Sequence, residues 1–86
     1  MAADKVYRVL SMYKQMLDGG IIDKDEAAER YDVNVRSILR DIADIREFME
    51  IRSLQNGDGN TVMYDRTHRG YVIKNISESQ TDKAEL

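Results

Sequence analysis

The sequence contains no cysteine, no tryptophan and a single histidine, His68. Without cysteine the chain has no thiolate nucleophile and no zinc-finger ligand set, and His68 alone cannot assemble a metal site. No apolar run approaches the roughly 18 residues of a membrane span, and the first residues lack the basic and apolar regions of a secretory signal. We therefore expect a cytoplasmic protein with no membrane segment, metal or cofactor.

Acidic residues outnumber basic ones: 16 Asp and Glu face 13 Lys and Arg, and the formal net charge is -3. Nucleic-acid-binding proteins are usually basic, so this balance opposes a nucleic-acid partner. The excess is concentrated near the C-terminus, because residues 1–74 hold 12 basic and 13 acidic side chains while residues 75–86 hold one and three. With room for one small core in 86 residues, we expect one domain over residues 1–74 and an acidic tail or linker over 75–86.

Apolar residues between Lys5 and Leu17 recur at the spacing of an amphipathic helix, and Gly19-Gly20 ends that pattern. These residues are Val6, Val9, Leu10, Tyr13 and Leu17. Ile21-Ile22 is long enough for one strand rung, and Asp23 with Glu26 resembles a capping box at the start of a helix over 24–31.

The strongest periodic signal belongs to a third helix over 34–50, which follows a short turn. Asp32 suits the left-handed conformation and Asn34 is a good N-cap. The apolar stripe of this helix is Val35, Ile38, Ile42, Ile45 and Met49. Two β-prone segments follow, 61–64 and 71–73, with turns before and between them. Three helices and a hairpin in this order predict an α+β fold, the winged helix-turn-helix.

Cationic side chains fall where such a fold meets DNA. Arg36 and Arg40 lie one turn apart on the first half of the third helix, with Ser37 between them. The second half of that helix is acidic, at Asp44, Glu47 and Glu50. A second group, Arg66, His68 and Arg69, lies at the predicted hairpin tip. We expect the helix over 34–50 to enter a major groove and the wing over 64–71 to contact the backbone or minor groove.

Other interpretations of the same residues stay open. Arg36 and Arg40 can be solvated side chains, with Arg40 paired to Asp44 one turn later. The hairpin cations can serve only to discourage sheet-to-sheet association. We expect Tyr64 and Tyr71 to pack on the helices, and the methionines to fill the core or a subunit contact. These methionines are Met12, Met16, Met49 and Met63.

Two segments carry a resemblance to a known family. Residues 26–46, EAAERYDVNVRSILRDIADIR, resemble the helix-turn-helix of bacterial WYL-domain transcription regulators, whose N-terminal module is DeoR-like. The recognition helix of that family typically reads Val-Ser-x-x-Thr-Ile-x-Arg-Asp-Ile-x-x-Leu-Arg. Residues 64–71, YDRTHRGY, are similar to the family's wing, which reads Tyr-Asp-Arg, a few basic residues and Gly-Tyr. The resemblance covers residues 5–74.

The resemblance implies roles for single residues. Asn34 takes the place of the capping Ser, Ser37 that of the Thr that faces DNA, and Arg40 and Asp41 those of the Arg-Asp pair, with Asp41 structural. Asp32 stands where Gly is common, and Leu39 where a polar residue is common. The expected DNA contacts are Asn34, Val35, Arg36, Ser37 and Arg40 on the helix and Arg66, Thr67, His68 and Arg69 on the wing.

By the same resemblance, the parent protein continues into a C-terminal sensing region that binds an effector and helps it to form a homodimer, and the present chain is a piece of it. We therefore expect a sequence-specific double-stranded DNA-binding domain of a bacterial regulator. The alternative is a winged-helix module for protein interaction or dimerisation without DNA binding. An enzyme is disfavoured, because the sequence offers no nucleophile with a base, no Gly-rich phosphate loop and no metal cluster.

Overall fold

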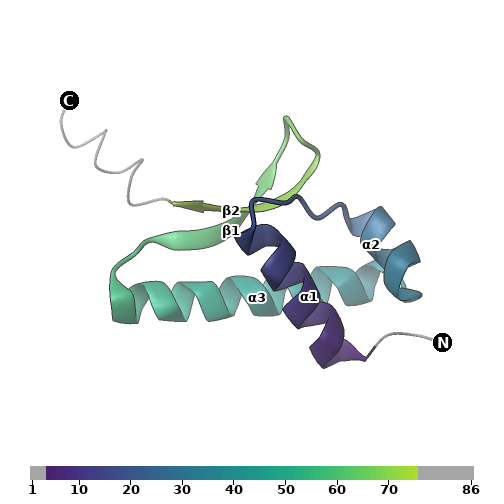
Figure 1. Ribbon diagram of the computed structural model, residues 1–86, viewed down its shortest axis with the longest axis horizontal. Coiled ribbons are helices and arrows are strands. Elements are labelled where there is room, and N and C mark those ends of the chain that lie inside the picture. The colour runs from purple at the N-terminus through teal and green to yellow at the C-terminus, as the bar shows by residue number, and fades with distance from the viewer. Residues whose placement is uncertain (1–3, 76–86) are drawn as a thin grey trace.

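Three helices are followed by a two-stranded antiparallel hairpin in the computed structural model, which describes residues 4–75 (Figure 1). The elements are α1 (Lys5–Leu17), α2 (Lys24–Tyr31), α3 (Val35–Asn56), β1 (Asn60–Asp65) and β2 (Gly70–Asn75). α3 is the longest element and packs against α1, α2 and β1. The predicted α+β layout of a winged helix-turn-helix is thereby confirmed.

Side-chain caps fix where the first two helices begin. The Asp4 carboxylate accepts the backbone N–H of Val6 at 3.1 Å, and the Asp23 carboxylate accepts those of Asp25 and Glu26 at 2.8 and 3.0 Å. Only half of the predicted capping box forms, because the Glu26 side chain pairs with Arg30 one turn later, at 2.7 Å, rather than reaching back to Asp23. The bounds predicted for α1 and α2 are confirmed.

α3 is longer than the predicted 34–50, since it continues to Asn56 and ends at Gly57 in the left-handed conformation. The prediction stopped early because the buried stripe ends at Met49. The last two turns carry apolar side chains, Ile51 and Leu54, but both are exposed. Periodicity of buried residues therefore marks the part of a helix that touches the core, and the left-handed glycine marks its true end.

The hairpin has a six-residue register from Asn60 opposite Asn75 to Asp65 opposite Gly70. The predicted rung at Ile21-Ile22 is confirmed as an isolated bridge, in which Ile22 and Tyr71 exchange backbone hydrogen bonds of 2.9 and 2.8 Å. Gly70 makes this approach possible, because a Cβ there would meet the Ile21 side chain and lie 2.8 Å from the Ile22 carbonyl oxygen. The hairpin is thus tied to the segment that precedes α2.

A single apolar core lies between the helices and the hairpin. It comprises Met12, Met16, Ile22, Ala27, Ala28, Tyr31, Ile38, Ile42, Ile45, Met49 and Val62. Tyr71 packs against this core as predicted, whereas Tyr64 is half exposed and contacts the Tyr71 ring edge-on at 5.2 Å. Met63 is exposed and so does not fill the core, which leaves the predicted subunit contact as its alternative. It lies on β1 after the buried Thr61 and Val62, at the start of the exposed part of the strand.

α1 buries a different stripe from the one that its apolar residues suggested. The buried residues are Arg8, Met12 and Met16, whereas Val6, Leu10 and Leu17 are exposed. The cause is Asp41 of α3, which is completely buried and accepts a hydrogen bond from Nε of Arg8 at 2.7 Å and one from Nζ of Lys5 at 2.9 Å. Arg8 must face the core to reach Asp41, and the residues four and eight positions later face it too.

Burial alone would raise the pKa of the Asp41 carboxyl, but the hydrogen bonds from Arg8 and Lys5 outweigh it and hold that pKa below its usual range. Asp41 is therefore ionised and acts as a structural anchor, as the family resemblance implied.

In the described part of the chain, no helix combines the length and the apolar character needed to cross a membrane. The predicted acidic tail over 75–86 lies outside the described residues except for Asn75.

We expect that breaking the buried pair on one side only is far more damaging than removing both partners. Asp41→Leu takes the carboxylate from the buried Arg8, and Arg8→Met leaves the buried Asp41 with Lys5 as its remaining ion-pair partner. We expect each change to cost about 3 to 5 kcal/mol of unfolding free energy. The double variant has neither buried charge and should recover most of that loss. Urea unfolding followed by circular dichroism measures all three, with Asp18→Asn, in the exposed Lys14–Asp18 pair, as a control of nearly unchanged stability. Additive losses in the double variant would contradict this account.

Candidate nucleic-acid interface

The turn between α2 and α3 sets where α3 begins. Asp32 adopts the left-handed conformation, with φ of 55°, and Val33 donates its N–H to the Ala28 carbonyl at 3.0 Å. Asn34 is the N-cap, and its side-chain oxygen accepts the N–H of Ser37 at 2.8 Å. The predicted roles of Asp32 and Asn34 in this turn are confirmed, and together they place the start of α3 at the surface beside α2.

The five residues expected to contact DNA from α3 differ in their accessibility. Arg36 and Arg40 are exposed. Ser37 is half-buried, and Val35 is half-buried against the core. Asn34 is exposed, but its oxygen is engaged by the cap. The accessible chemistry on the first half of α3 is therefore dominated by two guanidinium groups, one turn apart.

The hairpin tip is organised by one carboxylate. Asp65 accepts the backbone N–H groups of Thr67 and His68 at 2.9 and 3.3 Å, and its other oxygen lies 2.9 Å from Nδ1 of His68. The hydrogen bond from the His68 ring is the main cause that lowers the pKa of Asp65. Burial raises this pKa, whereas the two N–H groups and the charge of Lys74 lower it further. His68 thus has a structural partner within the tip, whereas the Thr67 side chain is exposed.

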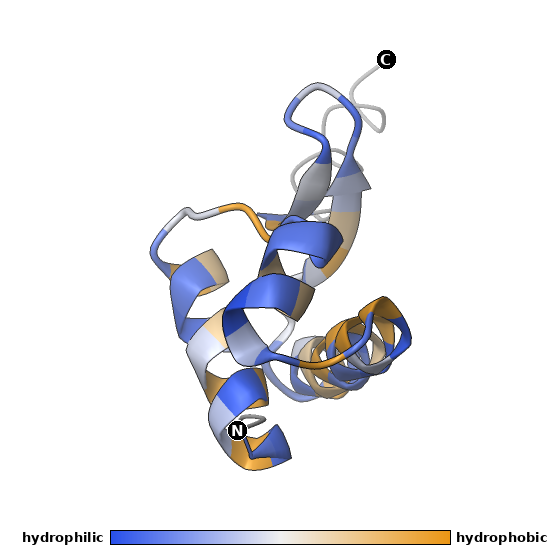
Figure 2. Ribbon diagram, turned by 90° about the vertical axis from the view of Figure 1, so that its right-hand side faces the viewer, coloured by the Kyte–Doolittle hydropathy of each residue, from blue (hydrophilic) through white to orange (hydrophobic). Residues whose placement is uncertain are grey.

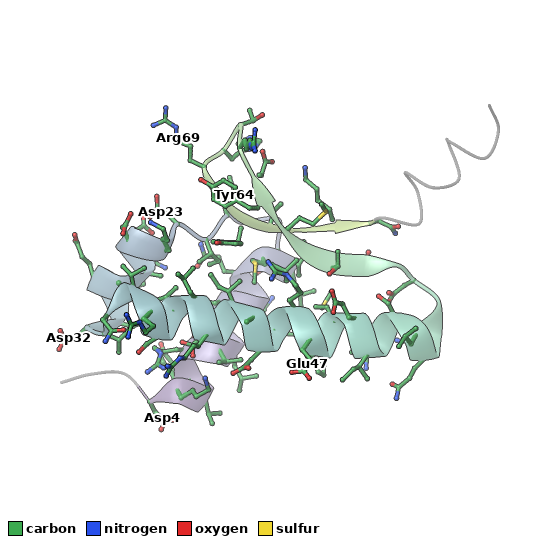
Figure 3. The ribbon with its side chains drawn as sticks, turned by 180° about the vertical axis from the view of Figure 1, so that it is seen from behind. Asp4, Asp23, Asp32, Glu47, Tyr64 and Arg69 are labelled. Atoms are coloured by element: carbon green, nitrogen blue, oxygen red, sulfur yellow. The ribbon has the colours of Figure 1, made fainter. Side chains whose placement is uncertain are left out.

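Arg66 and Arg69 complete the tip and are both exposed. Arg69 has φ of 55°, a left-handed conformation that glycine adopts without strain but that costs an arginine about 1 kcal/mol or more. Figure 3 shows Arg69 at the tip, above the half of α3 that follows Asp32 and away from Glu47. In Figure 2 the tip lies at the hydrophilic end of the scale. Arg69 therefore lies toward the half of α3 that carries Arg36 and Arg40.

Most basic residues are engaged within the protein. Ion pairs join Lys5 and Arg8 to Asp41, Lys14 to Asp18, Lys24 to Asp25, Arg30 to Glu26, and His68 and Lys74 to Asp65. Arg46 donates to the Val62 carbonyl at 3.2 Å, and the Arg52 guanidinium lies over the Phe48 ring at 5.8 Å. The remaining basic residues are Arg36, Arg40, Arg66 and Arg69, and none of them has an ion pair, hydrogen bond or ring contact with residues 4–75.

The first two acidic residues within α3, Asp41 and Asp44, are balanced from α1. Asp41 is bonded to Arg8 and Lys5, and Lys5 also lies 2.9 Å from an oxygen of Asp44. The alternative pair between Arg40 and Asp44 does not form, because Asp44 is engaged by Lys5 on the α1 side of the helix. Arg36 and Arg40 therefore have no neutralising carboxylate among the described residues, despite the acidic balance of the whole chain.

Two features were not predicted from the sequence, one at this surface and one in the core. Leu39 lies beside Arg40 and is 38% exposed, so it adds an apolar side chain to the outer side of α3. Arg8 was not assigned a role, although its position four residues before Met12 marks it as part of one helical stripe.

Among residues 4–75, no group of three or more His, Cys, Asp or Glu side chains is placed to hold a metal ion.

No protein-family model, curated protein or solved structure matches this chain. The resemblance to WYL-domain regulators therefore stays a prediction that rests on residues 26–46 and 64–71.

We expect Asn34 to contribute to stability through its cap. Asn34→Ala removes the acceptor for the Ser37 N–H and should cost about 1 kcal/mol of unfolding free energy, whereas Asn34→Ser restores an acceptor and should cost little. Thermal unfolding of the two variants checks this. If Asn34→Ala and Asn34→Ser destabilise the protein equally, the side-chain cap is not the means by which Asn34 contributes to stability.

Proposed function

We propose that this domain binds double-stranded DNA, with the first half of α3 in the major groove and the hairpin as a wing on the backbone or minor groove. One observation carries the proposal. The four basic residues without a partner among residues 4–75 are Arg36 and Arg40 on α3 and Arg66 and Arg69 on the hairpin tip. They belong to the two elements through which a winged helix-turn-helix meets DNA.

The first half of α3 suits a groove for physical reasons. A helix fits the width of the major groove, and guanidinium groups one turn apart can donate to base edges or to phosphates. The helix N-terminus adds a partial positive charge at the same end. Farther along, Glu47 and Glu50 would be repelled by phosphates, which favours entry of the leading half only.

The overall acidic charge does not oppose this proposal. Attraction to DNA is exerted by charges close to the phosphates and is screened beyond about 8 to 10 Å. The carboxylates of Asp41, Asp44 and Asp65 each lie close to basic side chains. Asp23 and Asp25 line a pocket with Arg69, and Lys24, in the same pocket, pairs with Asp25.

The strained backbone at Arg69 supports a role for its side chain. A left-handed residue at a hairpin tip is ordinarily Gly, Asn or Asp, and strain of this kind gathers at functional sites. We infer that the arginine at this position contributes to binding rather than to the stability of the turn.

The resemblance extends the proposal to the N-terminal domain of a cytoplasmic bacterial transcription regulator that forms a homodimer. Two-fold symmetry would require operator half-sites about one helical turn, or a multiple of it, apart. The effector of such a regulator would bind outside residues 1–74.

The first functional prediction concerns α3. We expect the chain to bind a duplex obtained by unbiased selection from random sequences more tightly than a scrambled duplex, with an affinity that falls as salt rises. Arg36→Gln and Arg40→Gln should each cost about 1 to 3 kcal/mol on the selected duplex if they donate to base edges. Fluorescence anisotropy at several salt concentrations measures both effects.

Arg30→Gln is the matched control, because it removes the same charge from a side chain bonded to Glu26 and Gln15. It should bind DNA nearly as the unmodified chain does. Absence of DNA binding at low salt would overturn the proposed function.

The second functional prediction separates the wing from α3. Arg69→Gly removes the guanidinium and relieves the left-handed strain, so it should weaken binding to selected and scrambled duplexes by a similar factor without lowering the melting temperature. Arg40→Ala should instead reduce discrimination between the two duplexes. If Arg69→Gly binds DNA with unchanged affinity, the wing is not part of the interface. If Arg40→Ala weakens binding to both duplexes equally, Arg40 has no role in sequence recognition.

A further inference from the structure

The exposed side of α1 and the last half of α3 form one apolar surface, here called the α1–α3 face. It consists of Val6, Leu10, Tyr13 and Leu17 from α1 and Phe48 and Ile51 from α3. The α1 residues follow one another at helical spacing, so they share one side of the helix. Val6, Leu10 and Leu17 are 63%, 59% and 52% exposed, respectively, which is unusual for the side of a helix that carries most of its large apolar residues.

The two helices meet in a groove at the centre of this face. Val9, Leu10 and Tyr13 line it from α1, and Asp44, Ile45 and Phe48 from α3, around a space of about 220 Å³. The rings of Tyr13 and Phe48 contact each other edge-on, with centroids 5.6 Å apart. The groove and the α1 stripe are therefore continuous, and the stripe is not a scatter of isolated apolar residues.

The size of the face indicates a contact of limited strength. From the exposed fractions, its apolar area is about 500 Å², near the upper end for a monomer's largest patch. Two such faces together would bury about 1,000 Å², which is at the lower limit for a specific protein interface. A self-contact of this area would have a dissociation constant in the micromolar range or weaker.

The charges around the face favour a second copy of this chain as its partner. In a two-fold contact the same patch meets itself, so any net charge would be repelled by its own copy. Most of the bordering charges occur as neighbours of opposite sign, Lys5 with Asp44 and Lys14 with Asp18, whereas Glu47, next to Phe48, forms no ion pair with residues 4–75. The positive charge of Arg52, whose guanidinium lies over the Phe48 ring, is one of the causes that lower the pKa of Asp58. A strongly charged partner would therefore meet no large patch of opposite charge on this surface.

The face and the exposed arginines are separated along the molecule. On α3, Phe48 and Ile51 lie two turns or more after Arg40, on the half that carries Glu47 and Glu50, whereas Asp44 in the groove lies one turn after Arg40. The hairpin tip contributes no residue to the face, so a dimer formed here would leave Arg66 and Arg69 accessible.

We propose that the α1–α3 face is a self-association surface through which two copies of this chain form a two-fold dimer. The contact is driven by burial of the α1 stripe and the Tyr13–Phe48 groove, and it does not depend on DNA binding.

Sedimentation velocity of the full chain without DNA, from low to high micromolar concentration, tests this proposal. The unmodified chain should shift from monomer toward dimer and stop there. Leu10→Glu places a charge in the centre of the face and should remain monomeric over the whole range. Met63→Glu is the matched control, because Met63 is 40% exposed on β1 and belongs to neither helix of the face, and it should dimerise as the unmodified chain does.

Ile51→Glu tests the α3 side of the same face, and far-UV circular dichroism verifies that each variant is folded. A monomer at every concentration would overturn the proposal, whether the face is covered by residues 76–86 or left free. Equal loss of association in the Leu10 and Met63 variants, or growth beyond a dimer, would overturn it as well.

Discussion

The buried contact between Asp41 and Arg8 is the interaction on which the arrangement of this protein depends. A carboxylate without water must have its charge compensated, and the nearest compensation comes from another helix. The contact therefore fixes both the position of α1 against α3 and its rotation about its own axis. It also places the negative charge of α3 on the α1 side, because Lys5 engages Asp41 and Asp44 together. Arg36 and Arg40, on the first half of α3, form no ion pair with residues 4–75.

The same contact explains why apolar residues of α1 remain outside. Once Arg8 faces the core, Met12 and Met16 on its stripe fill the space beside α3. Methionine suits such a space because its long side chain adapts to irregular gaps. The more hydrophobic stripe, with Val6, Leu10 and Leu17, then faces solvent. One ion pair thus decides which side of α1 builds the core and which is left for another molecule.

Local signals in the sequence were sufficient for much of the fold. Caps, left-handed turn residues and glycines act within a few residues, and they correctly predicted the starts of the helices and the bridge at Ile22. The buried side of α1 was not predictable in this way, because it depends on Arg8 meeting a residue 33 positions later in the chain. The end of α3 was missed because its last turns touch no core. At the proposed interface, the types and positions of the arginines were evident from the sequence, but their lack of ion pairs was not.

The bridge between Ile22 and Tyr71 has a mechanical consequence. It joins the connection before α2 to the second strand, at the point where Gly70 lets the two backbones approach closely. The helix-turn-helix and the base of the hairpin are therefore held as one rigid body, with little freedom to adjust the gap between them. Under the proposed function, differences in groove width among duplexes would have to be accommodated by bending or twisting of the DNA, so that flexible base steps would be favoured even where no side chain reaches a base.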